Sequence, residues 1–532
     1  MMLVSVITLG CKVNEYESQS ILNQLKMEGY DICEGLKKAD AYIINTCAVT
    51  NVAERKSRQV LAKIFKLNPE AKVAVCGCAV QNNPTQFLKN KNIIAIVGNE
   101  GKNAIIKFIK QKNKELLELN NEKYNNTARP IMTRTRQYIK IQDGCNYFCT
   151  YCIIPYLRGR SRSRDIDDIL DEIRQTSANE IVLTGINISD YRIGNELGLK
   201  RLIKKIDKLN VRFRISSLEC NVLDDEMIEI LKNSKNFCPH FHISLQSACN
   251  ETLKRMNRRY TIEEYINIVK KIRSNFNNPS ISTDIIVGFK GETEEEFNQT
   301  VENLKIIQFS FMHIFPYSER SGTNATKLSG AIDRCEQKRR EHVLQEMNKE
   351  FKHNFYNQNK NTVHKVLIEE VIDENLSLGY TDNYIYTYID AKCKVGDIVD
   401  AKLISEYENG MKAQSKYREE IMEDCIFCKI KKGELPSTTL YSDDEFMIIK
   451  DINPQAKIHL IAIPNEHVPY IDMMTEEGAI KLGKMISKIS HLQEELGLTG
   501  GYRLVINQGD NAGQTVAHVH IHILGGEKLK EL

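Results

Sequence analysis

The sequence contains no apolar run close to the ~20 residues that a membrane-spanning helix needs. Its N-terminus, "MMLVSVITLGCKVNE", lacks the basic start and the cleavage-site pattern of a signal peptide. No internal repeat or low-complexity tract alters the division of the chain. These absences argue against a membrane or exported protein, and we expect a cytoplasmic one. Because 532 residues exceed what one hydrophobic core organises, the chain should form several domains.

Fifteen cysteines are present, but the chain is long and has no export signal, so a disulfide scaffold is not expected. We expect reduced metal ligands or buried thiols, and the spacing of the cysteines must decide between them. The formal net charge is +3. Such a mild positive excess permits a nucleic-acid partner, although a solvated mixed surface has the same composition.

The pattern of apolar residues divides the chain into four parts and predicts a multidomain α/β fold. Residues 1–120 alternate short aliphatic runs with amphipathic stretches, as in a parallel α/β sheet. After a polar linker near 120–130, strand–helix alternation recurs six times in residues 131–358, which predicts a partial (β/α)6 barrel with its active site at the strand C-termini. Residues 360–418 contain short strands typical of a small β-barrel, and residues 424–532 form the last unit.

The first chemical signal is "DGCNYFCTYCIIP", which places Cys145, Cys149 and Cys152 directly after the first predicted barrel strand. Three thiolates at this spacing can wrap one corner of a [4Fe-4S] cluster. The open iron can then bind the amino and carboxylate groups of S-adenosylmethionine (SAM). A zinc knuckle is the alternative, but zinc requires a fourth protein ligand and none lies nearby in the sequence.

This motif resembles the radical SAM superfamily, and more narrowly its methylthiotransferases, over most of residues 1–420. The resemblance implies that strand-end motifs such as "VLTGINI" and "HISLQS" supply polar groups around SAM. The candidates, each of which could also be an ordinary strand-end residue, are Asn187, Glu219, Ser244 and Gln246. Arg158 opens a basic run whose guanidinium groups could hold a phosphate or the SAM carboxylate, with a solvated charged loop as the alternative.

A second triplet of cysteines ends strands of the N-terminal domain: Cys11, Cys47 and Cys78. In an open parallel sheet, ligands bind in the crevice beyond the strand C-termini, so cysteines distant in sequence can converge there. Strand-end cysteines are also common as buried small hydrophobes. The motifs "TLGCKVNEYES", "NTCAVTNVAERKS" and "CGCAVQ" resemble the methylthiotransferase N-terminal domain, and this implies a second [4Fe-4S] cluster that supplies or carries sulfur.

The same motifs are similar to one branch of the family, which acts on threonylcarbamoyladenosine in tRNA. The isopentenyladenosine branch reads Gln-Met-Asn after its first cysteine, where this chain has Lys12, Val13 and Asn14. The resemblance implies 2-methylthiolation of threonylcarbamoyladenosine at position 37 of tRNA, with a flavodoxin- or ferredoxin-like electron donor. Another tRNA adenosine or a ribosomal protein is the alternative substrate.

The resemblance also covers the small β-barrel and includes departures from the family pattern. Residues 360–418 resemble a TRAM domain, an RNA-binding barrel, in which Tyr380, Tyr384 and Tyr386 either contact RNA or support the fold. Lys290 and Cys220 stand where prolines are usual, and "QSACN" replaces "QSGSD". No cluster cysteine is affected, so these departures concern loop shape more than chemistry.

The C-terminal "HVHIHIL" alternates with period two, so a strand there would place His518, His520 and His522 on one face. Clustered histidines can simply be solvated, but residues 424–532 closely resemble an α+β histidine-triad (HIT) nucleotide hydrolase. The resemblance implies that His520 is the nucleophile and that His459 and His522 orient and polarise its surroundings. The implied nucleotide contacts are Asp451, Ile452, Asn507, Gln514 and Thr515.

Two cysteines at the start of this domain, with two histidines, suggest a zinc site. Cys425 and Cys428 form a C-x-x-C, and with His467 and His518 they would give a tetrahedral set of two thiolates and two imidazoles. A redox pair is the alternative, but no thioredoxin-like frame surrounds it. The domain is expected to bind a purine nucleotide and can dimerise; a nucleotide-binding module without turnover is the alternative to a hydrolase.

Overall fold

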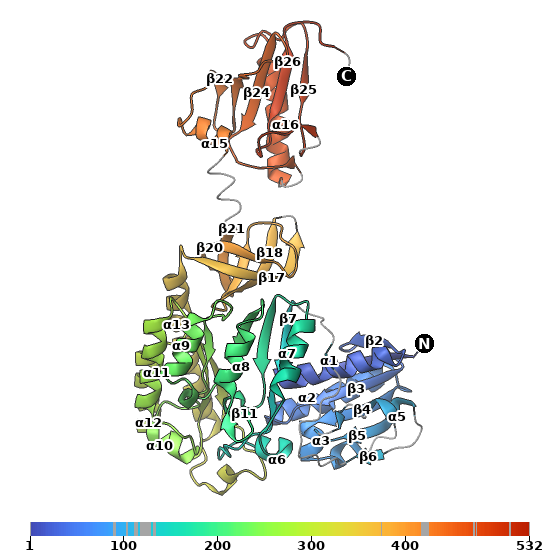
Figure 1. The fold of residues 1–532 in the computed structure, drawn as a ribbon, viewed down its shortest axis with the longest axis vertical. Helices are drawn as coiled ribbons and strands as arrows, with labels where there is room; N and C mark the ends of the chain where they lie inside the picture. Colours follow the sequence, from blue (N-terminus) through green and yellow to red (C-terminus); the bar gives the residue numbers. More distant parts are fainter. Residues whose placement is uncertain are drawn as a thin grey trace. The chain divides into compact units, whose positions relative to one another are not determined.

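The structure is a computed structural model that describes residues 2–88, 92–99, 101–102, 105–110, 115–117, 129–130, 135–373, 375–415, 425–471, 474, 476–509 and 512–530. Most of the predicted linker near 120–130 lies outside these residues. The chain divides into two units. Unit 1 comprises Met1–Asn359 with Asp382–Tyr384, and unit 2 comprises Lys360–Thr381 with Ile385–Leu532. Each part is described by itself (Figure 1).

The N-terminal domain is a parallel sheet with the strand order β2-β1-β3-β4-β5-β6. Its strands are β1 (Leu3–Thr8), β2 (Asp31–Glu34), β3 (Ala41–Thr46), β4 (Lys72–Gly77), β5 (Ile93–Val97) and β6 (Glu115–Leu117). Its helices are α1 (Lys12–Met27), α2 (Asn51–Leu67), α3 (Cys78–Asn82), α4 (Thr85–Leu88) and α5 (Ile105–Lys110). Apolar residues of α1 and α5 pack on one face of the sheet, and those of α2, α3 and α4 pack on the other. Aliphatic strands buried on both faces explain the continuous apolar runs.

Six parallel strands form the partial barrel, as predicted. They are β7 (Arg136–Lys140), β10 (Glu180–Thr184), β13 (Arg212–Ile215), β14 (His240–His242), β15 (Ser280–Val287) and β16 (Phe311–Pro316). They pair as β13-β10-β7 and β14-β15-β16, and isolated parallel bridges such as Leu218 with Ile243 join the two halves. The short pairs are β8 (Gln142–Asp143) with β9 (Arg162–Ser163), and β11 (Arg192–Ile193) with β12 (Glu196–Leu197).

Helices cover the outside of this barrel, and local sequence fixes where several of them begin. They are α6 (Ile154–Arg158), α7 (Ile166–Gln175), α8 (Leu199–Ile206), α9 (Asp225–Asn233), α10 (Asn250–Arg255), α11 (Ile262–Asn275), α12 (Glu294–Ile307) and α13 (Arg334–Asn359). Thr261 and Thr293 start α11 and α12 with capping boxes, in which the threonine and the glutamate three residues later satisfy each other's backbone N–H groups.

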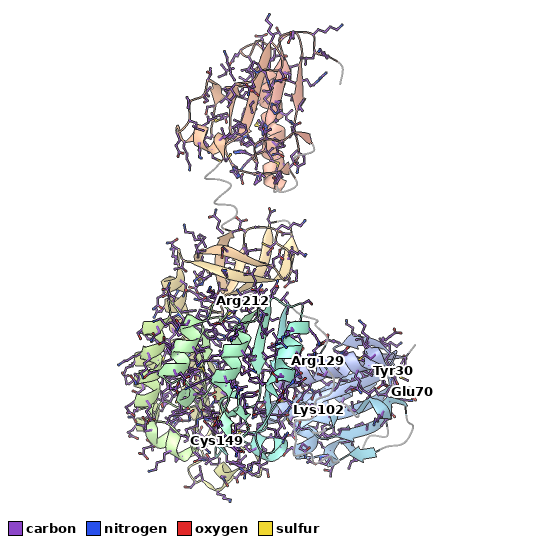
Figure 2. The ribbon with its side chains drawn as sticks, viewed as in Figure 1. Tyr30, Glu70, Lys102, Arg129, Cys149 and Arg212 are labelled. Carbon is purple, nitrogen blue, oxygen red and sulfur yellow. The ribbon has the colours of Figure 1, made fainter. Side chains whose placement is uncertain are left out.

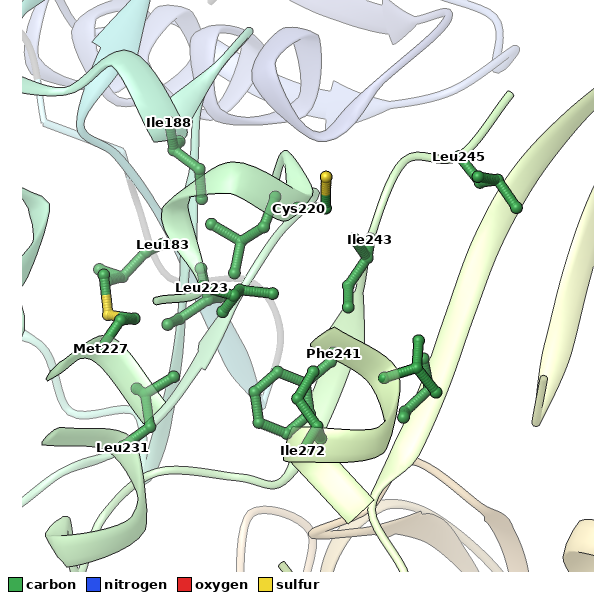
Figure 3. Packing of buried hydrophobic residues seen from close by; sticks show 14 of the residues in the cluster. Leu183, Ile188, Cys220, Leu223, Met227, Leu231, Phe241, Ile243, Leu245 and Ile272 are labelled. Carbon is green, nitrogen blue, oxygen red and sulfur yellow. The ribbon is translucent and has the colours of Figure 1, made fainter. Parts of the chain in front are cut away.

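The two faces of each barrel strand differ in character. Alternate residues such as Ile181, Phe213 and Ile281 belong to the large apolar core shared with the helices. Figure 3 shows part of this core, with Phe241 and Ile243 of the β14 region beside Ile272 of α11. Because successive side chains of a strand point to opposite faces, the remaining alternate residues face the barrel interior, and these are mainly polar.

The β-barrel of unit 2 is closed, with the strand order β17-β18-β19-β21-β20. Its strands are β17 (Val363–Asp373), β18 (Leu376–Thr381), β19 (Tyr386–Ile389), β20 (Ile398–Tyr407) and β21 (Gly410–Ser415). Gly379 allows β17 and β18 to approach closely, since a Cβ there would lie 2.1 Å from the carbonyl oxygen of Leu367. This confirms the predicted small β-barrel.

The C-terminal domain is an antiparallel sheet with the strand order β22-β23-β24-β26-β25. Its elements are α15 (Ile426–Lys431), β22 (Thr439–Ser442), β23 (Phe446–Lys450), β24 (Ile458–Pro464), α16 (Glu476–His491), β25 (Tyr502–Val505) and β26 (Ile521–Gly525). The histidine run differs from the expected strand, because β26 begins only at Ile521. Val519 instead donates its backbone N–H to the carbonyl of Val468, 2.7 Å away, and both His518 and His520 are buried.

The predicted fold class, a multidomain α/β protein with a partial barrel, a small closed barrel and an α+β C-terminal domain, is confirmed. In the described part of the chain, no helix combines the length and apolar character required to cross a membrane.

Candidate functional site

Cys145, Cys149 and Cys152 lie on one tight loop between β8 and α6. Gly144 begins the loop with φ +71°, and a Cβ there would lie 2.0 Å from the carbonyl oxygen of Arg160, so the backbone requires glycine. Cys149, labelled in Figure 2, is buried, and the other two cysteine residues are partly exposed. Burial, followed by the neighbouring Cys149 thiol, raises the pKa of Cys152 to about 12. A raised pKa disfavours the thiolate form, and a bound metal would supply the positive charge that stabilises it.

Arg258 lies at the centre of this site, although no motif in the sequence pointed to it. Its guanidinium donates to the Sγ of Cys149 at 3.2 Å and to the carbonyl oxygen of Ser244 at 3.1 Å, and it forms an ion pair with Glu219. Burial raises the pKa of Glu219, and Arg258 opposes this effect. A lone arginine after a helix carries no periodicity or spacing, so only the fold could reveal it.

The other predicted SAM-contacting residues lie around the same strand ends. Asn187 donates its side-chain N–H to the Sγ of Cys145 at 3.7 Å. The backbone of Ser244 accepts hydrogen bonds from Arg258 and from the Tyr260 hydroxyl. Gln246 has φ +72° and exchanges backbone hydrogen bonds with β15. The structure thus brings Asn187, Glu219, Ser244 and Gln246 to the C-terminal end of the barrel.

Two glycines bring the cysteines of the second triplet together. Gly10 has φ +112°, and a Cβ there would lie 2.7 Å from the Cβ of Cys47, so the loop that carries Cys11 passes directly over Cys47. Gly77 has φ +98°, and its Cβ would lie 2.6 Å from the carbonyl oxygen of Thr46. Cys78 therefore starts α3 beside the end of β3. Burial raises the pKa of Cys47 to about 11; the hydrogen bond from the Val49 backbone opposes this, and the nearby Cys78 thiol adds to it.

The spacing of the sulfurs within each triplet suits a cluster better than a single ion. Among the described residues, neither triplet is found among the groups whose ligand atoms all lie within 4.8 Å of one another. A mononuclear zinc site needs such close ligands, whereas the cysteines of a cubane bind separate irons and stand farther apart. The two triplets therefore fit iron–sulfur clusters.

Arg158 is buried in an ion network that joins the N-terminal domain to the barrel. Its terminal nitrogens lie 3.0 Å from Glu17, 3.1 Å from Asp143 and 2.8 Å from the side-chain oxygen of Asn14. Lys140 contacts both carboxylates as well, at 2.6 and 2.7 Å. Arg158 thus lies between the two cysteine-bearing loops. Its guanidinium binds carboxylates of the chain itself and not a SAM carboxylate.

Two of the departures from the family pattern have partners other than the cluster cysteines. Cys220 is buried in the apolar core near Leu223 and Ile243 (Figure 3). Lys290 forms an ion pair with Glu319 and donates to the carbonyl of Thr326.

In the C-terminal domain, Cys425, Cys428, His467 and His518 converge, with ligand atoms within 4.8 Å of one another. The Nδ1 of His518 lies 3.4 Å from the Sγ of Cys425, and the Nδ1 of His467 lies 3.2 Å from the Sγ of Cys428. The Nε2 of His518 donates to the carbonyl of Pro464 at 3.1 Å, which leaves the Nδ1 lone pair facing the thiols. Two thiols and two inward-facing ring nitrogens fit tetrahedral zinc.

His520 is held as a neutral imidazole by its partners. Its Nδ1 lies 2.6 Å from the carbonyl oxygen of His518 and must donate to it, so Nε2 carries the free lone pair. Burial lowers the pKa of His520, which keeps the ring uncharged at neutral pH. A neutral ring with a free nitrogen can act as a nucleophile.

Beside this centre, hydrogen bonds link His459 with His522 and Asp451. The backbone N–H of Gln455 donates to the Nδ1 of His459, so the Nε2 of His459 is the donor. This Nε2 lies 2.9 Å from the Nδ1 of His522 and 3.3 Å from the carboxylate of Asp451. The ring of His522 lies 4.9 Å from that of His520, centroid to centroid. The fold therefore orients His459 and His522 beside His520.

The predicted nucleotide contacts differ in how much of each side chain is available. Ile452 is 91% exposed, Thr515 is exposed and Asn507 is half-buried. Gln514 is buried, and its amide group binds the loop itself: it accepts from the backbone of Gly509 and donates to the carbonyl of Pro469. Gln514 therefore shapes the loop.

Three family models match the chain. Residues 3–98 match "Uncharacterized protein family UPF0004", residues 139–304 match "Radical SAM superfamily", and residues 432–529 match "HIT domain". Members of the radical SAM superfamily use [4Fe-4S] clusters and SAM, and the cysteine loop lies within the matched residues.

Curated relatives match most of the chain before the HIT domain. The threonylcarbamoyladenosine tRNA methylthiotransferase MtaB of Bacillus subtilis is 36% identical over 419 residues, covering 75% of this chain and 92% of that protein. The Aquifex aeolicus protein of the same name is also 36% identical, covering 75% of this chain and 99% of its own length. A tRNA-2-methylthio-N(6)-dimethylallyladenosine synthase of Thermodesulfovibrio yellowstonii is 32% identical, covering 77% and 97%.

Among solved structures, a HIT family hydrolase from Clostridium thermocellum is 44% identical and covers 21% of this chain and 96% of that one, with a TM-score of 0.20. From the relatives' identity and coverage, together with the matched family models, the chain belongs to the radical SAM tRNA methylthiotransferase family and carries a C-terminal HIT domain.

Proposed function

We propose that the part of the chain before the HIT domain adds a methylthio group to threonylcarbamoyladenosine at position 37 of tRNA. The observation that carries this proposal is the 36% identity, over nearly their whole length, to two relatives with that name. The relative named for the dimethylallyl substrate is 32% identical. When bound, a [4Fe-4S] cluster and SAM supply the carbon radical for such chemistry, and Asn187, Glu219 and Arg258 line the place where SAM would lie.

The test is an anaerobic assay of the reconstituted full chain with SAM, reductant and tRNA carrying threonylcarbamoyladenosine. We expect the 2-methylthio nucleoside in digested tRNA by mass spectrometry. Turnover of isopentenyladenosine tRNA instead would assign the other branch, and a protein that cleaves no SAM would be an RNA-binding module.

The two cysteine triplets are proposed to hold two independent [4Fe-4S] clusters. Replacement of Cys145, Cys149 and Cys152 by alanine should abolish SAM cleavage while iron remains at the other triplet. Replacement of Cys11, Cys47 and Cys78 should spare SAM cleavage and stop sulfur insertion. Iron analysis and Mössbauer spectra would check both variants, and unchanged iron content in either would contradict the assignment.

A tyrosine row on the small β-barrel supports tRNA binding. The ring centroids of Tyr380 and Tyr386 are 5.0 Å apart, those of Tyr386 and Tyr388 are 5.2 Å apart, and those of Tyr388 and Tyr407 are 5.0 Å apart. Lys412 lies 4.3 Å above the Tyr407 ring. Aromatic rings beside a cation can stack unpaired bases and attract phosphate. Tyr384 differs, because it stacks on His240 of the partial barrel.

The HIT domain is proposed to hydrolyse purine nucleoside phosphoramidates, with His520 as nucleophile and zinc held by Cys425, Cys428, His467 and His518. The neutral, oriented ring of His520 supports this proposal. We expect one zinc per chain by elemental analysis and its loss in Cys428→Ser. A chain that binds the nucleotide but hydrolyses no phosphoramidate would be a binding module.

The proposal also includes two partners. Reductive cleavage of SAM needs a one-electron donor, for which a flavodoxin- or ferredoxin-like protein is suited. The second partner is another copy of the HIT domain, and sedimentation of the full chain would test this dimerisation.

A further inference from the structure

Three side chains that can bind a metal meet on the inner face of β14, β15 and β16, where no motif pointed to a site. They are His242, Asp284 and His313, and their ligand atoms all lie within 4.8 Å of one another. The carboxylate of Asp284 lies 3.3 Å from the Nε2 of His242. Asp284 and His313 are direct partners in the β15–β16 register, and the ring centroids of His242 and His313 are 5.8 Å apart. We call these three residues the barrel site.

The barrel site faces the interior of the partial barrel and is in contact with solvent. The flanking residues Ile285 and Met312 belong to the apolar core against the helices, so Asp284 and His313, at alternate positions, point to the opposite side. The side chains of His242 and Asp284 are 13% and 29% exposed, and His313 is exposed. A cation from solution can therefore reach all three residues without displacing the core.

An ion pair would account for His242 and Asp284, but it leaves His313 without a polar partner. Among the described residues, the ring nitrogens of His313 form no hydrogen bond. Its ring is held by aromatic contacts instead: Phe311 meets it edge-on at 4.7 Å, and Phe315 stacks on it at 6.3 Å, centroid to centroid. Partial burial lowers the pKa of His313, so the ring is neutral at neutral pH and has a free lone pair. A third ligand is thus oriented beside the pair.

His242 has the kind of partner that orients a metal-binding imidazole. Its Nδ1 lies 3.0 Å from the hydroxyl oxygen of Ser282, the neighbouring residue in the β14–β15 register. A hydroxyl oxygen has lone pairs that can accept the Nδ1–H, and the Nε2 then keeps its own lone pair towards Asp284. Metal-bound histidines usually donate their second ring N–H in this way, which fixes the tautomer and the direction of the ring.

The composition and spacing of the barrel site suit a transition metal. Bonds of about 2.0–2.2 Å at a tetrahedral angle place two ligand atoms about 3.4 Å apart, close to the 3.3 Å between His242 and Asp284. The same distance fits a direct ion pair, so the third residue, His313, decides in favour of a metal. Two imidazoles and one carboxylate bind zinc or ferrous iron and leave coordination positions open, whereas magnesium prefers oxygen ligands.

We propose that His242, Asp284 and His313 bind a first-row divalent cation, such as zinc or ferrous iron, inside the partial barrel. This site uses none of the cysteines of the two triplets and none of the ligands of the C-terminal zinc set. Its open coordination positions would take water or an oxygen of a bound molecule. The inference does not depend on which tRNA nucleoside the chain modifies.

The experiment uses Co²⁺ as the probe, because cobalt can be counted separately from the iron of the clusters and the zinc of the HIT domain. The full chain, with both clusters reconstituted and zinc loaded, is dialysed anaerobically against CoCl₂ and analysed for cobalt, iron and zinc. We expect about one cobalt per chain. His313→Ala and Asp284→Asn should each raise the dissociation constant for cobalt at least about tenfold and leave the iron and zinc contents unchanged. His313 is exposed, so its replacement leaves no hole in the core.

The matched control is His342→Ala, which removes an exposed histidine of α13 and should keep the cobalt. X-ray absorption at the cobalt edge should show nitrogen and oxygen neighbours only, and zinc but not magnesium should displace the cobalt. Three results would overturn the inference. No bound cobalt would leave His242 and Asp284 as an ion pair, sulfur neighbours would place the cobalt at cysteines, and equal binding by His313→Ala would place it at other residues.

Discussion

The two catalytic parts of this chain assemble their sites in opposite ways. In unit 1, Asn14 and Glu17 of the N-terminal domain contact the side chain of Arg158 from the barrel, and buried charges hold them together. In the HIT domain, His520 and His459 are oriented by backbone groups a few residues away. The geometry of a site held by charges from distant segments depends on each charged side chain. The geometry of a site held by nearby backbone groups tolerates side-chain substitutions elsewhere. Single substitutions should therefore affect one part without the other.

The largest effect is expected in the HIT domain. His520→Asn removes the nucleophilic ring nitrogen and should reduce phosphoramidate hydrolysis by at least about a thousandfold. Nucleotide binding and SAM cleavage should persist, because Asp451 and unit 1 are unchanged. Hydrolysis by the full chain and nucleotide binding by calorimetry would measure this. His313→Asn, in the partial barrel, is the control and should leave hydrolysis intact; full activity of His520→Asn would assign the chemistry to another residue.

Arg158→Met should destabilise only unit 1. It leaves Glu17 and Asp143 as buried carboxylates with fewer cations, and we expect a loss of about 3–5 kcal/mol in the unfolding free energy of that unit. Denaturant unfolding followed by probes in each unit would show the HIT transition unmoved.

The matched control is Arg174→Met. Arg174 pairs with Asp171 at 2.6 Å, but both side chains are more than half exposed. Its loss should cost at most about 1 kcal/mol. Similar losses from both substitutions would mean that the buried network does not hold unit 1 together.

Acid should also destabilise unit 1 through Glu180. Burial favours the neutral carboxyl, but Arg214, Arg212 and Arg136 overcome this and lower the pKa of Glu180 to about 2 from an ordinary 4.5. Because the folded pKa is the lower one, its stabilisation, about 3 kcal/mol, is complete above about pH 4.5 and is lost as the pH falls towards 2. Glu180→Gln should flatten the stability profile of unit 1 in this window, as measured by unfolding at a series of pH values. An unchanged profile would locate the acid sensitivity elsewhere.

The smallest effect is expected at Gly10. Gly10→Ala places a Cβ against Cys47 at a positive φ and should cost about 1–2 kcal/mol while lowering iron content at the N-terminal triplet. Gly29→Ala is the control, since it has φ +84° and nothing within 4 Å. Gly29→Ala should lose stability through backbone strain but keep its iron content. Iron analysis in a chain that lacks the Cys145 triplet would measure this.

The sequence predicted the architecture well because its signals are local. Six apolar runs predicted six barrel strands, and the C-x3-C-x2-C spacing located one loop without knowledge of the fold. The histidine run was less well described: alternation predicted a strand from His518, but the chain joins the sheet only at Ile521. Period two describes an extended backbone, and it cannot tell whether a neighbouring strand is there to pair.

Arg158 shows a different limit. A basic run near a cluster loop suggested anion binding, but Glu17 and Asp143 come from separate segments and take up its charge. Arg258 gave no signal at all, since a single charged residue has no period.

The sequence alone determined the order of the domains, the local cysteine loop and the chemistry of the residue types, because periodicity and spacing are properties of neighbouring residues. Only the tertiary structure decided which charges are paired. It joined Arg158 to Glu17 and set Arg258 against Cys149, because these contacts depend on which strands lie side by side and on burial, and both arise only when distant segments fold together.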